Sequence, residues 1–122
     1  MTQSGSRGSG EWRLPDELRE LAQGGDAEIV QEVLTVFQTD TATRLESLQA
    51  AAAASDMPRV KSQAHSIKGS AGQVGAIGMA ALCQRIEQQA GQGAQVAPLV
   101  GELTEAFARV CQAIAAEQEL LG

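Results

Sequence analysis

Residues 57–91 read MPRVKSQAHSIKGSAGQVGAIGMAALCQRIEQQAG, and their apolar positions follow the period of an α-helix twice in succession. In the first half, apolar residues recur every three or four positions, at Val60, Ala64, Ile67, Ala71 and Val74. The second half repeats this spacing, at Met79, Leu82, Cys83, Ile86 and Ala90. Such spacing is typical of one buried helix face. We therefore predict helices over residues 57–75 and 77–91, with Gly75 ending the first.

The sequence on either side continues the same helical period. Upstream, one apolar row predicts a helix from Asp26, which can cap it, to about Ala54, with Thr41 as its only polar interruption. Its apolar members are Val30, Leu34, Phe37, Leu45, Leu48 and Ala52. Downstream of the break at Gly91-Gln92-Gly93, a second row predicts a helix over residues 96–121. Its apolar members are Leu99, Leu103, Phe107, Val110, Ile114 and Leu121.

Local signals place the remaining boundaries. A short helix over residues 14–22 would have Pro15 in its first turn and would end at Gly24-Gly25. Ser55 or Asp56 can cap the helix that follows, which has Pro58 in its first turn.

Four long amphipathic helices with short connections favour antiparallel neighbours. No run of alternating apolar and polar residues predicts a strand. The predicted fold class is all-α: an antiparallel up-and-down four-helix bundle with a short extra N-terminal helix. We assign residues 1–11, which are rich in Gly and Ser, to a flexible leader and residues 12–122 to one domain.

Composition excludes several classes of function. The net charge of −6 and the pI near 4.7 argue against nucleic acid and against an anionic membrane surface. No stretch approaches the roughly 20 apolar residues of a membrane span. The first ten residues lack the apolar segment that a secretory signal peptide contains. Cys83 and Cys111 fall at apolar helix positions. We therefore expect both to be buried free thiols of a protein in the reducing cytoplasm. With one histidine, the chain lacks the four Cys or His ligands of a structural zinc site, so we expect no metal.

The predicted helix over residues 57–75 carries an unusual polar face. His65 lies about 100° to the side of the apolar row, and Lys61, Lys68, Gly69 and Gly72 share its face. A neutral imidazole is a nucleophile, and the ammonium groups one turn away can stabilise a phosphoryl dianion. The face therefore fits an anion site around a nucleophile better than an ordinary solvated histidine.

The two glycines are costly in a helix interior, by roughly 1 kcal/mol each relative to alanine. They could allow close packing against another helix of the bundle. However, the apolar row already supplies that contact, and the glycines lie beside it with His65. We favour the interpretation that a partner from outside approaches His65 closely.

These residues carry a resemblance to a known family. The stretch AHSIKGSAGQVGA over residues 64–76, followed by LCQRIE over residues 82–87, resembles the motif AHxLKGSSxxxGAxxLxxxCxxLE of histidine-containing phosphotransfer (HPt) domains in multistep two-component phosphorelays. The order of the helices over residues 14–121 is similar as well. The resemblance implies an all-α bundle that carries a phosphoryl group.

The resemblance also implies roles for individual residues. His65 would be the phospho-acceptor, reacting through Nε2, and Lys68 would stabilise the phosphoryl group. Gly69 matches the glycine that leaves room for a receiver domain, and we place Lys61 and Gly72 with it as partner-binding residues. Glu87 falls at the position where members of the family often have a Glu or Gln. That side chain hydrogen-bonds the other ring nitrogen, Nδ1, so Glu87 would orient His65.

Two departures from the motif bear on the site. Ile67 stands in place of the commoner Leu. Some relatives have a basic residue four positions after the Glu or Gln, but Gly91 occupies that position here, so Lys61 is the substitute we expect.

The chain has no nucleotide-binding motif, and Ser66 stands where the dimerisation helices of sensor kinases have an acidic residue after the histidine. We expect a monomeric phosphocarrier without kinase activity or a cofactor of its own, located in the cytoplasm. Its partners would be a response-regulator receiver domain, a hybrid histidine kinase, or both. The receiver would bring the aspartate and the Mg²⁺.

Two other functions remain open at this point. The phosphotransfer module of a chemotaxis-type histidine kinase shares the H-S-I-K-G pattern. That module begins a long multidomain chain, whereas this sequence ends at Gly122, directly after its last predicted helix. The second is a non-catalytic helical adaptor that binds receivers, although such a relative would be expected to lose the histidine.

Overall fold

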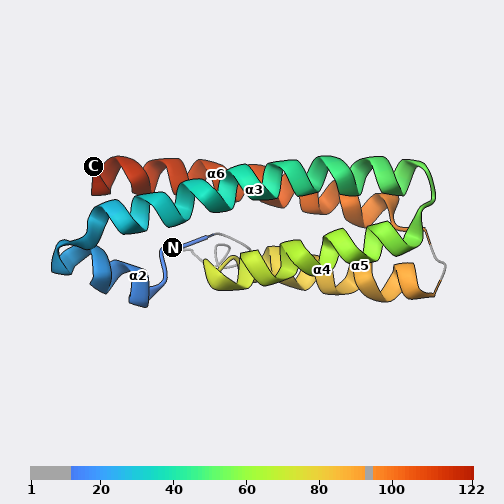
Figure 1. The fold of residues 1–122 in the computed structure, drawn as a ribbon, viewed down its shortest axis with the longest axis horizontal. Helices are drawn as coiled ribbons and strands as arrows, with labels where there is room; N and C mark the ends of the chain where they lie inside the picture. Colours follow the sequence, from blue (N-terminus) through green and yellow to red (C-terminus); the bar gives the residue numbers. More distant parts are fainter. Residues whose placement is uncertain (1–11, 93–94) are drawn as a thin grey trace, which may run out of the picture.

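The computed structural model describes residues 12–92 and 95–122, and all regular structure in these ranges is helical. Four long helices, α3 (Ala27–Ala53), α4 (Met57–Gln73), α5 (Ile77–Gly91) and α6 (Ala97–Leu121), follow the short α2 (Asp16–Leu21). Helices adjacent in sequence pack together, and α6 closes against α3 (Figure 1). The predicted four-helix bundle with an extra N-terminal helix is confirmed, with helix boundaries within a few residues of those predicted.

The junction between α2 and α3 differs from the expected break at Gly24-Gly25. A π-helical turn, η1 (Ala22–Asp26), joins the two helices. Gly25 bends the chain there with a φ of 107°, a conformation that glycine adopts without steric cost. Asp26 is the N-cap residue of α3, as predicted, but its side chain makes no capping hydrogen bond.

The turns that flank α4 follow their local sequence signals. Asp56 caps α4 by accepting a hydrogen bond from the backbone N–H of Arg59 at 3.3 Å. At the other end, Gly75 has a φ of 76°, and the N–H of Ala76 donates to the carbonyl of Ala71 at 2.8 Å. This arrangement is a Schellman motif, which requires a left-handed residue after the helix. Gly75 therefore stops α4 as predicted.

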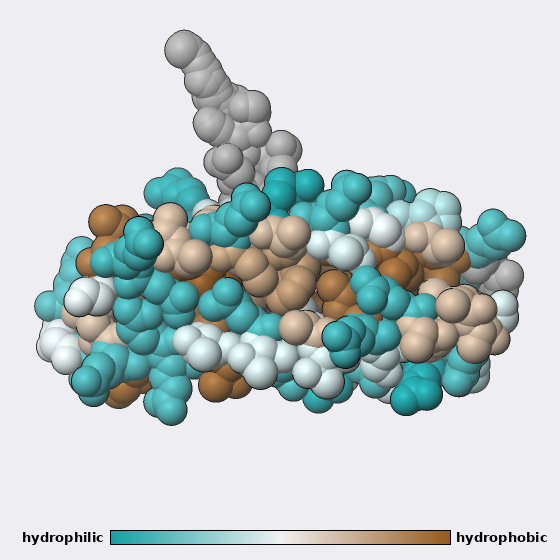
Figure 2. All heavy atoms as spheres, turned by 90° about the horizontal axis from the view of Figure 1, so that it is seen from above, coloured by the Kyte–Doolittle hydropathy of each residue, from teal (hydrophilic) through white to brown (hydrophobic). Residues whose placement is uncertain are grey.

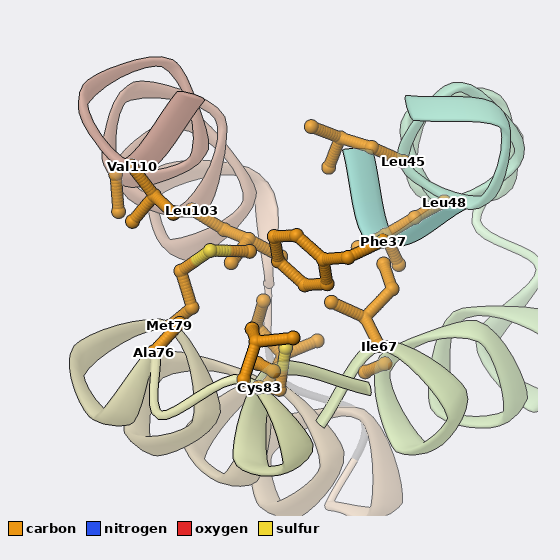
Figure 3. Close-up of a cluster of buried hydrophobic side chains, with 14 of the residues drawn as sticks. Phe37, Leu45, Leu48, Ile67, Ala76, Met79, Cys83, Leu103 and Val110 are labelled. Atoms are coloured by element: carbon orange, nitrogen blue, oxygen red, sulfur yellow. The ribbon is translucent and has the colours of Figure 1, made fainter. Parts of the chain in front are cut away.

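The core runs along the centre of the bundle and consists mainly of aliphatic side chains from all four long helices (Figure 3). Phe37 of α3 and Phe107 of α6 meet edge to face, with ring centroids 6.2 Å apart. Thr41 is also buried, and its hydroxyl has no hydrogen-bond partner among the described residues. The predicted burial was wrong at a few positions. Ala51 is buried rather than Ala52, and four other residues expected in the core are only half-buried. These are Leu82, Phe107, Cys111 and Leu121.

The segment before α2 anchors the turn between α4 and α5. Trp12 is buried, and its Nε1–H donates to the carbonyl of Val74 at 2.7 Å. Pro15 lies against Gly75, where an added Cβ would meet its Cγ at 2.8 Å. This end of the helical pair α4–α5 is therefore fixed to the rest of the domain. The leader predicted over residues 1–11 lies outside the described residues.

The outer surface mixes hydrophilic side chains with separate hydrophobic areas on the face shown in Figure 2. No described helix combines the length and the apolar content needed to cross a bilayer.

Candidate functional site

The middle of α4 holds His65 outside the core. Its neighbours Ala64 and Ile67 are fully buried, whereas the side chain of His65 is 69% exposed. This contrast follows from helix geometry, since one residue step rotates a side chain by about 100°. The structure thus presents the imidazole to solvent from a rigid, well-packed helix.

Glu87 of α5 contacts the inner nitrogen of the His65 ring. Its Oε2 lies 3.0 Å from Nδ1. A carboxylate can only accept a hydrogen bond, so this contact favours the tautomer with the proton on Nδ1. The lone pair of the neutral ring then resides on Nε2. The predicted contact between His65 and Glu87 is present.

Glu87 is held in place by a cation. Its side chain is only 14% exposed, and Nζ of Lys68 lies 2.6 Å from Oε1. The two side chains form an ion pair. Burial of the Glu87 carboxylate works to raise its pKa, but the contacts with Lys68 and His65 outweigh burial, and the pKa of Glu87 lies below its ordinary value. Glu87 is therefore ionised at neutral pH.

Lys68 makes a second contact that the sequence analysis missed. Its Nζ donates a hydrogen bond to Oε1 of Gln84 at 2.8 Å. Gln84 lies three residues before Glu87, so the two side chains share one face of α5. That spacing could have identified Gln84 as a member of the site.

Lys61 lies on the opposite side of the ring from Lys68, one turn nearer the start of α4. It is exposed, and it lines an open hollow together with Pro58, Ser62, His65, Ser66 and Glu87. Its Nζ also lies 3.9 Å from the point where a Cβ at Gly91 would stand. The ammonium of Lys61 therefore occupies space that a side chain at position 91 would otherwise use.

Gly69 and Gly72 leave the rest of this face bare. Both are exposed, and no described atom outside the local helix backbone lies within 4 Å of a Cβ built at either position. The alternative that these glycines allow close packing inside the bundle is therefore wrong. Their openness is consistent with the approach of a partner.

An apolar groove beside this face was not predicted. It has a volume of about 420 Å³ and lies between α3 and the end of α4. Its apolar wall includes three exposed residues of α3, and Ser70 and Gln73 of α4 form the side next to the glycines. The three exposed residues are Ile29, Val33 and Val36. Their spacing marks a second apolar row next to the core row, and that pattern could have revealed the groove.

The described residues do not assemble a metal site. No three His, Cys, Asp or Glu side chains within residues 12–92 and 95–122 gather as metal ligands would. Cys83, one turn before Glu87, is fully buried, and burial together with the Glu87 charge raises the pKa of its thiol to about 12. At neutral pH this thiol is therefore almost entirely protonated, which makes it a poor nucleophile.

Comparisons with known proteins agree with this geometry. The family model described as the Hpt domain matches residues 32–113, a range that includes His65, Lys68 and Glu87. The crystal structure of histidine-containing phosphotransfer protein B (HptB) from Pseudomonas aeruginosa PAO1 is similar, with a TM-score of 0.77 and 32% sequence identity over 87% of this chain and 94% of that chain. A search of curated proteins gave no match. Because the family model covers more than half of the sequence and the structural match extends over nearly all of the bundle, the chain belongs to the Hpt family of histidine-containing phosphotransfer domains.

Proposed function

We propose that His65 is the phospho-accepting residue of this Hpt domain. It would take a phosphoryl group from the aspartate of a receiver domain, or from a histidine kinase, and pass it to the receiver aspartate of a response regulator. One observation about the His65 ring carries the proposal: its Nδ1 is bound to the half-buried carboxylate of Glu87, while the His65 side chain stays 69% exposed. Hpt domains serve as phosphocarriers in phosphorelays and interact with receiver domains and histidine kinases, which supports this assignment.

The transfer step follows from the tautomer. The Nε2 lone pair attacks the phosphorus of an aspartyl phosphate, and the bond between phosphorus and the carboxylate oxygen breaks as the N–P bond forms. The carboxylate leaves with the electron pair. The imidazole ring gains positive charge in this step, and Glu87, whose Oε2 lies 3.0 Å from Nδ1, stabilises that charge. In the reverse reaction, the phosphoryl group is transferred from Nε2 to the aspartate of the next receiver.

The chain itself supplies positioning and charge. Lys61 and Lys68 bring two ammonium groups to the surroundings of His65, where a phosphoryl dianion needs them. The Mg²⁺ and the acceptor carboxylate belong to the receiver, because aspartate chemistry on phosphorus requires the metal at the aspartate. The protein would act as a monomer in the cytoplasm and leave the catalysis to its partner.

We propose that the receiver docks over Gly69 and Gly72 and extends onto the groove between α3 and α4. The glycines allow the partner to come close to His65, and the exposed Val33 and Val36 offer apolar surface next to them. Two carboxylates line the same groove: Glu32, and Asp40, which also pairs with Arg44 at 3.0 Å. A receiver surface with apolar residues flanked by basic ones would be complementary to it.

Phosphotransfer from a purified receiver tests the proposal. The receiver is first phosphorylated with acetyl phosphate and Mg²⁺. It is then mixed with the wild-type protein or the His65→Gln variant, and the products are separated on a phosphate-affinity gel. We expect an acid-labile, base-stable phosphoprotein with the wild type and none with the variant. Circular dichroism should show equal helicity and nearly equal melting temperatures, because His65 is exposed. Phosphotransfer to His65→Gln would refute the assignment.

A further inference from the structure

The two ammonium groups near His65 differ in what they already bind. Lys61 and Lys68 are the only lysines of the 122-residue chain, one turn before and one turn after His65 on the same face of α4. The other seven basic residues are arginines, and none of those that the structure describes lines the two hollows around Glu87. The positive charge available there thus comes from two side chains of equal length.

Lys68 is already engaged. Its Nζ lies 2.6 Å from Oε1 of Glu87 and 2.8 Å from Oε1 of Gln84. An ammonium has three N–H donors, and two oxygens already lie within 2.8 Å of this one. If the ammonium moved to a phosphoryl group on Nε2, Oε1 of Glu87, which is shut off from solvent, would lose the cation that lies 2.6 Å from it. Leaving a buried carboxylate oxygen without a partner is unfavourable.

The ammonium of Lys61, by comparison, makes no ion pair with a described carboxylate. Among the described residues, no carboxylate lies within 4.0 Å of its ammonium. Helical side chains lean toward the start of their helix, so the His65 ring leans over the turn that contains Lys61 and Ser62. The hollow shared by these residues, with Ser66 on its other side, agrees with that direction. A phosphoryl group on Nε2 can therefore meet Lys61 without breaking an existing ion pair.

Gly91 explains why Lys61 can reach this position. The last residue of α5 has no side chain, and Nζ of Lys61 lies 3.9 Å from the point where a Cβ would stand. The C-terminal end of a helix also attracts a cation, because its free carbonyls carry partial negative charge. The side chain of Lys61 thus lies beside the end of α5, lines the same hollow as Glu87 and stays exposed to solvent.

We propose that Lys61 is the residue that binds the phosphoryl group on His65, and that Lys68 is a positioning residue that acts through Glu87. This division of roles rests on the proposed phosphorylation of His65. It differs from the expectation that Lys68 stabilises the phosphoryl group, which came from its position one turn from His65 and from the family resemblance.

Chemical phosphorylation separates the two roles without a receiver. With potassium phosphoramidate as donor, Nε2 attacks phosphorus, the donor P–N bond breaks, and ammonia leaves with the electron pair. The pKa of the phosphoryl group on His65 is then followed by ³¹P NMR in the wild type, Lys61→Met, Lys68→Met and a control, Arg59→Met. Arg59 is an exposed cation of α4 that faces away from His65. The tautomer of the unphosphorylated ring is followed by ¹⁵N NMR in the same proteins.

Removing a cation that touches a dianion raises the pKa of that dianion. We expect Lys61→Met to raise the phosphoryl pKa by about half a unit or more, and by more than Lys68→Met or Arg59→Met. Lys61→Arg should keep the wild-type value. Lys68→Met should instead reduce the population of the Nδ1–H tautomer, which Lys61→Met should leave unchanged.

Two results would overturn the inference: a larger phosphoryl shift for Lys68→Met than for Lys61→Met, or an unchanged tautomer in Lys68→Met. A wild-type protein that accepts no phosphoryl group on His65, from phosphoramidate or from a receiver, would overturn the proposed function itself.

Discussion

Nδ1 of His65 and Oε2 of Glu87 lie 3.0 Å apart, but the two side chains differ greatly in exposure, at 69% for His65 and 14% for Glu87. The half-buried Glu87 sets which nitrogen of the exposed His65 ring carries the proton. A solvated imidazole divides its proton between two nitrogens, whereas this contact favours the form with a lone pair on Nε2. The contact also joins α4 to α5, so the orientation of the ring depends on the packing of these two helices.

The first prediction concerns this contact. Glu87→Ala should lower the rate of phosphotransfer to a receiver by about tenfold or more, the usual effect of losing a group that orients a functional histidine. Glu87→Gln, whose amide oxygen can still accept from Nδ1, should lose less. The exposed Glu102 of α6 provides a matched control, and Glu102→Ala should transfer at the wild-type rate. Equal rates for all four proteins would show that the contact has no role in transfer.

The lowered pKa of Glu87 predicts a pH dependence of stability. A group whose pKa is lower in the folded state stabilises the fold above its unfolded pKa, and this contribution is lost as the pH falls through the folded pKa. The free energy of unfolding of wild type should therefore exceed that of Glu87→Gln by a constant amount near neutral pH. The difference should shrink from about pH 4.3 downward. Urea denaturation of both proteins across this range measures it, and a difference that does not change with pH would contradict the prediction.

The groove between α3 and α4 gives a third prediction. Val36 is 59% exposed, so Val36→Asp should cost little stability but place a charge where the receiver is proposed to bind. We expect the Kd for the receiver to rise about tenfold, or roughly 1.4 kcal/mol. Leu120, which is 80% exposed near the end of α6, does not line this groove, so Leu120→Asp is the control. If both variants bind the receiver as tightly as wild type, the groove is not part of the interface.

The two thiols provide a test of the packing around Glu87. Burial raises the pKa of Cys83 to about 12, and burial also raises the pKa of the half-buried Cys111. Because the thiolate is the reactive form, native protein should react slowly with iodoacetamide, and first at Cys111. Mass spectrometry with and without urea would reveal the order. Faster labelling of Cys83 would mean that α5 is less tightly packed than described.

Local patterns accounted for most of the fold. The apolar rows of α4 and α5 have the helical period, and Gly75 and Asp56 mark ends that depend only on nearby backbone. At Gly24-Gly25, the same local argument predicted the end of a helix. The structure has a kink in a continuous helical path instead, because one positive φ at Gly25 was enough to redirect the chain.

Contacts between distant residues were harder to predict. The pair His65–Glu87 was expected from the family resemblance and from the position of Glu87 at the border of the core row. The bond from Trp12 to Val74, 62 residues apart, depends on how the N-terminal segment crosses the bundle, which no local pattern specifies. Likewise, spacing shows that Lys68 is near His65, but only the packing of α4 on α5 shows that Gln84 and Glu87 hold its ammonium.

Gly69 is exposed on α4, as its position beside the apolar row predicts. It lies inside α4 with helical neighbours on both sides, and no described atom outside the local backbone lies within 4 Å of an added Cβ. Glycine at such a position weakens the helix, so Gly69→Ala should raise the free energy of unfolding by up to about 1 kcal/mol. Gly69→Gln should also fold. Its longer side chain would stand where the receiver is proposed to approach His65, so the Kd should rise and transfer should slow.

Gly101 in α6 separates the stability effect from the binding effect. It is exposed, helical and equally free of contacts at its Cβ position, but it lies on α6, whose main neighbours in the bundle are α3 and α5. Gly101→Ala and Gly101→Gln should match the stability changes at Gly69 in urea denaturation while leaving receiver titrations unchanged. A destabilised Gly69→Ala would mean that the site is more crowded than the structure indicates. A Gly69→Gln variant that binds the receiver like wild type would mean that the receiver does not need the bare backbone at position 69 to approach, even if His65 carries the phosphoryl group.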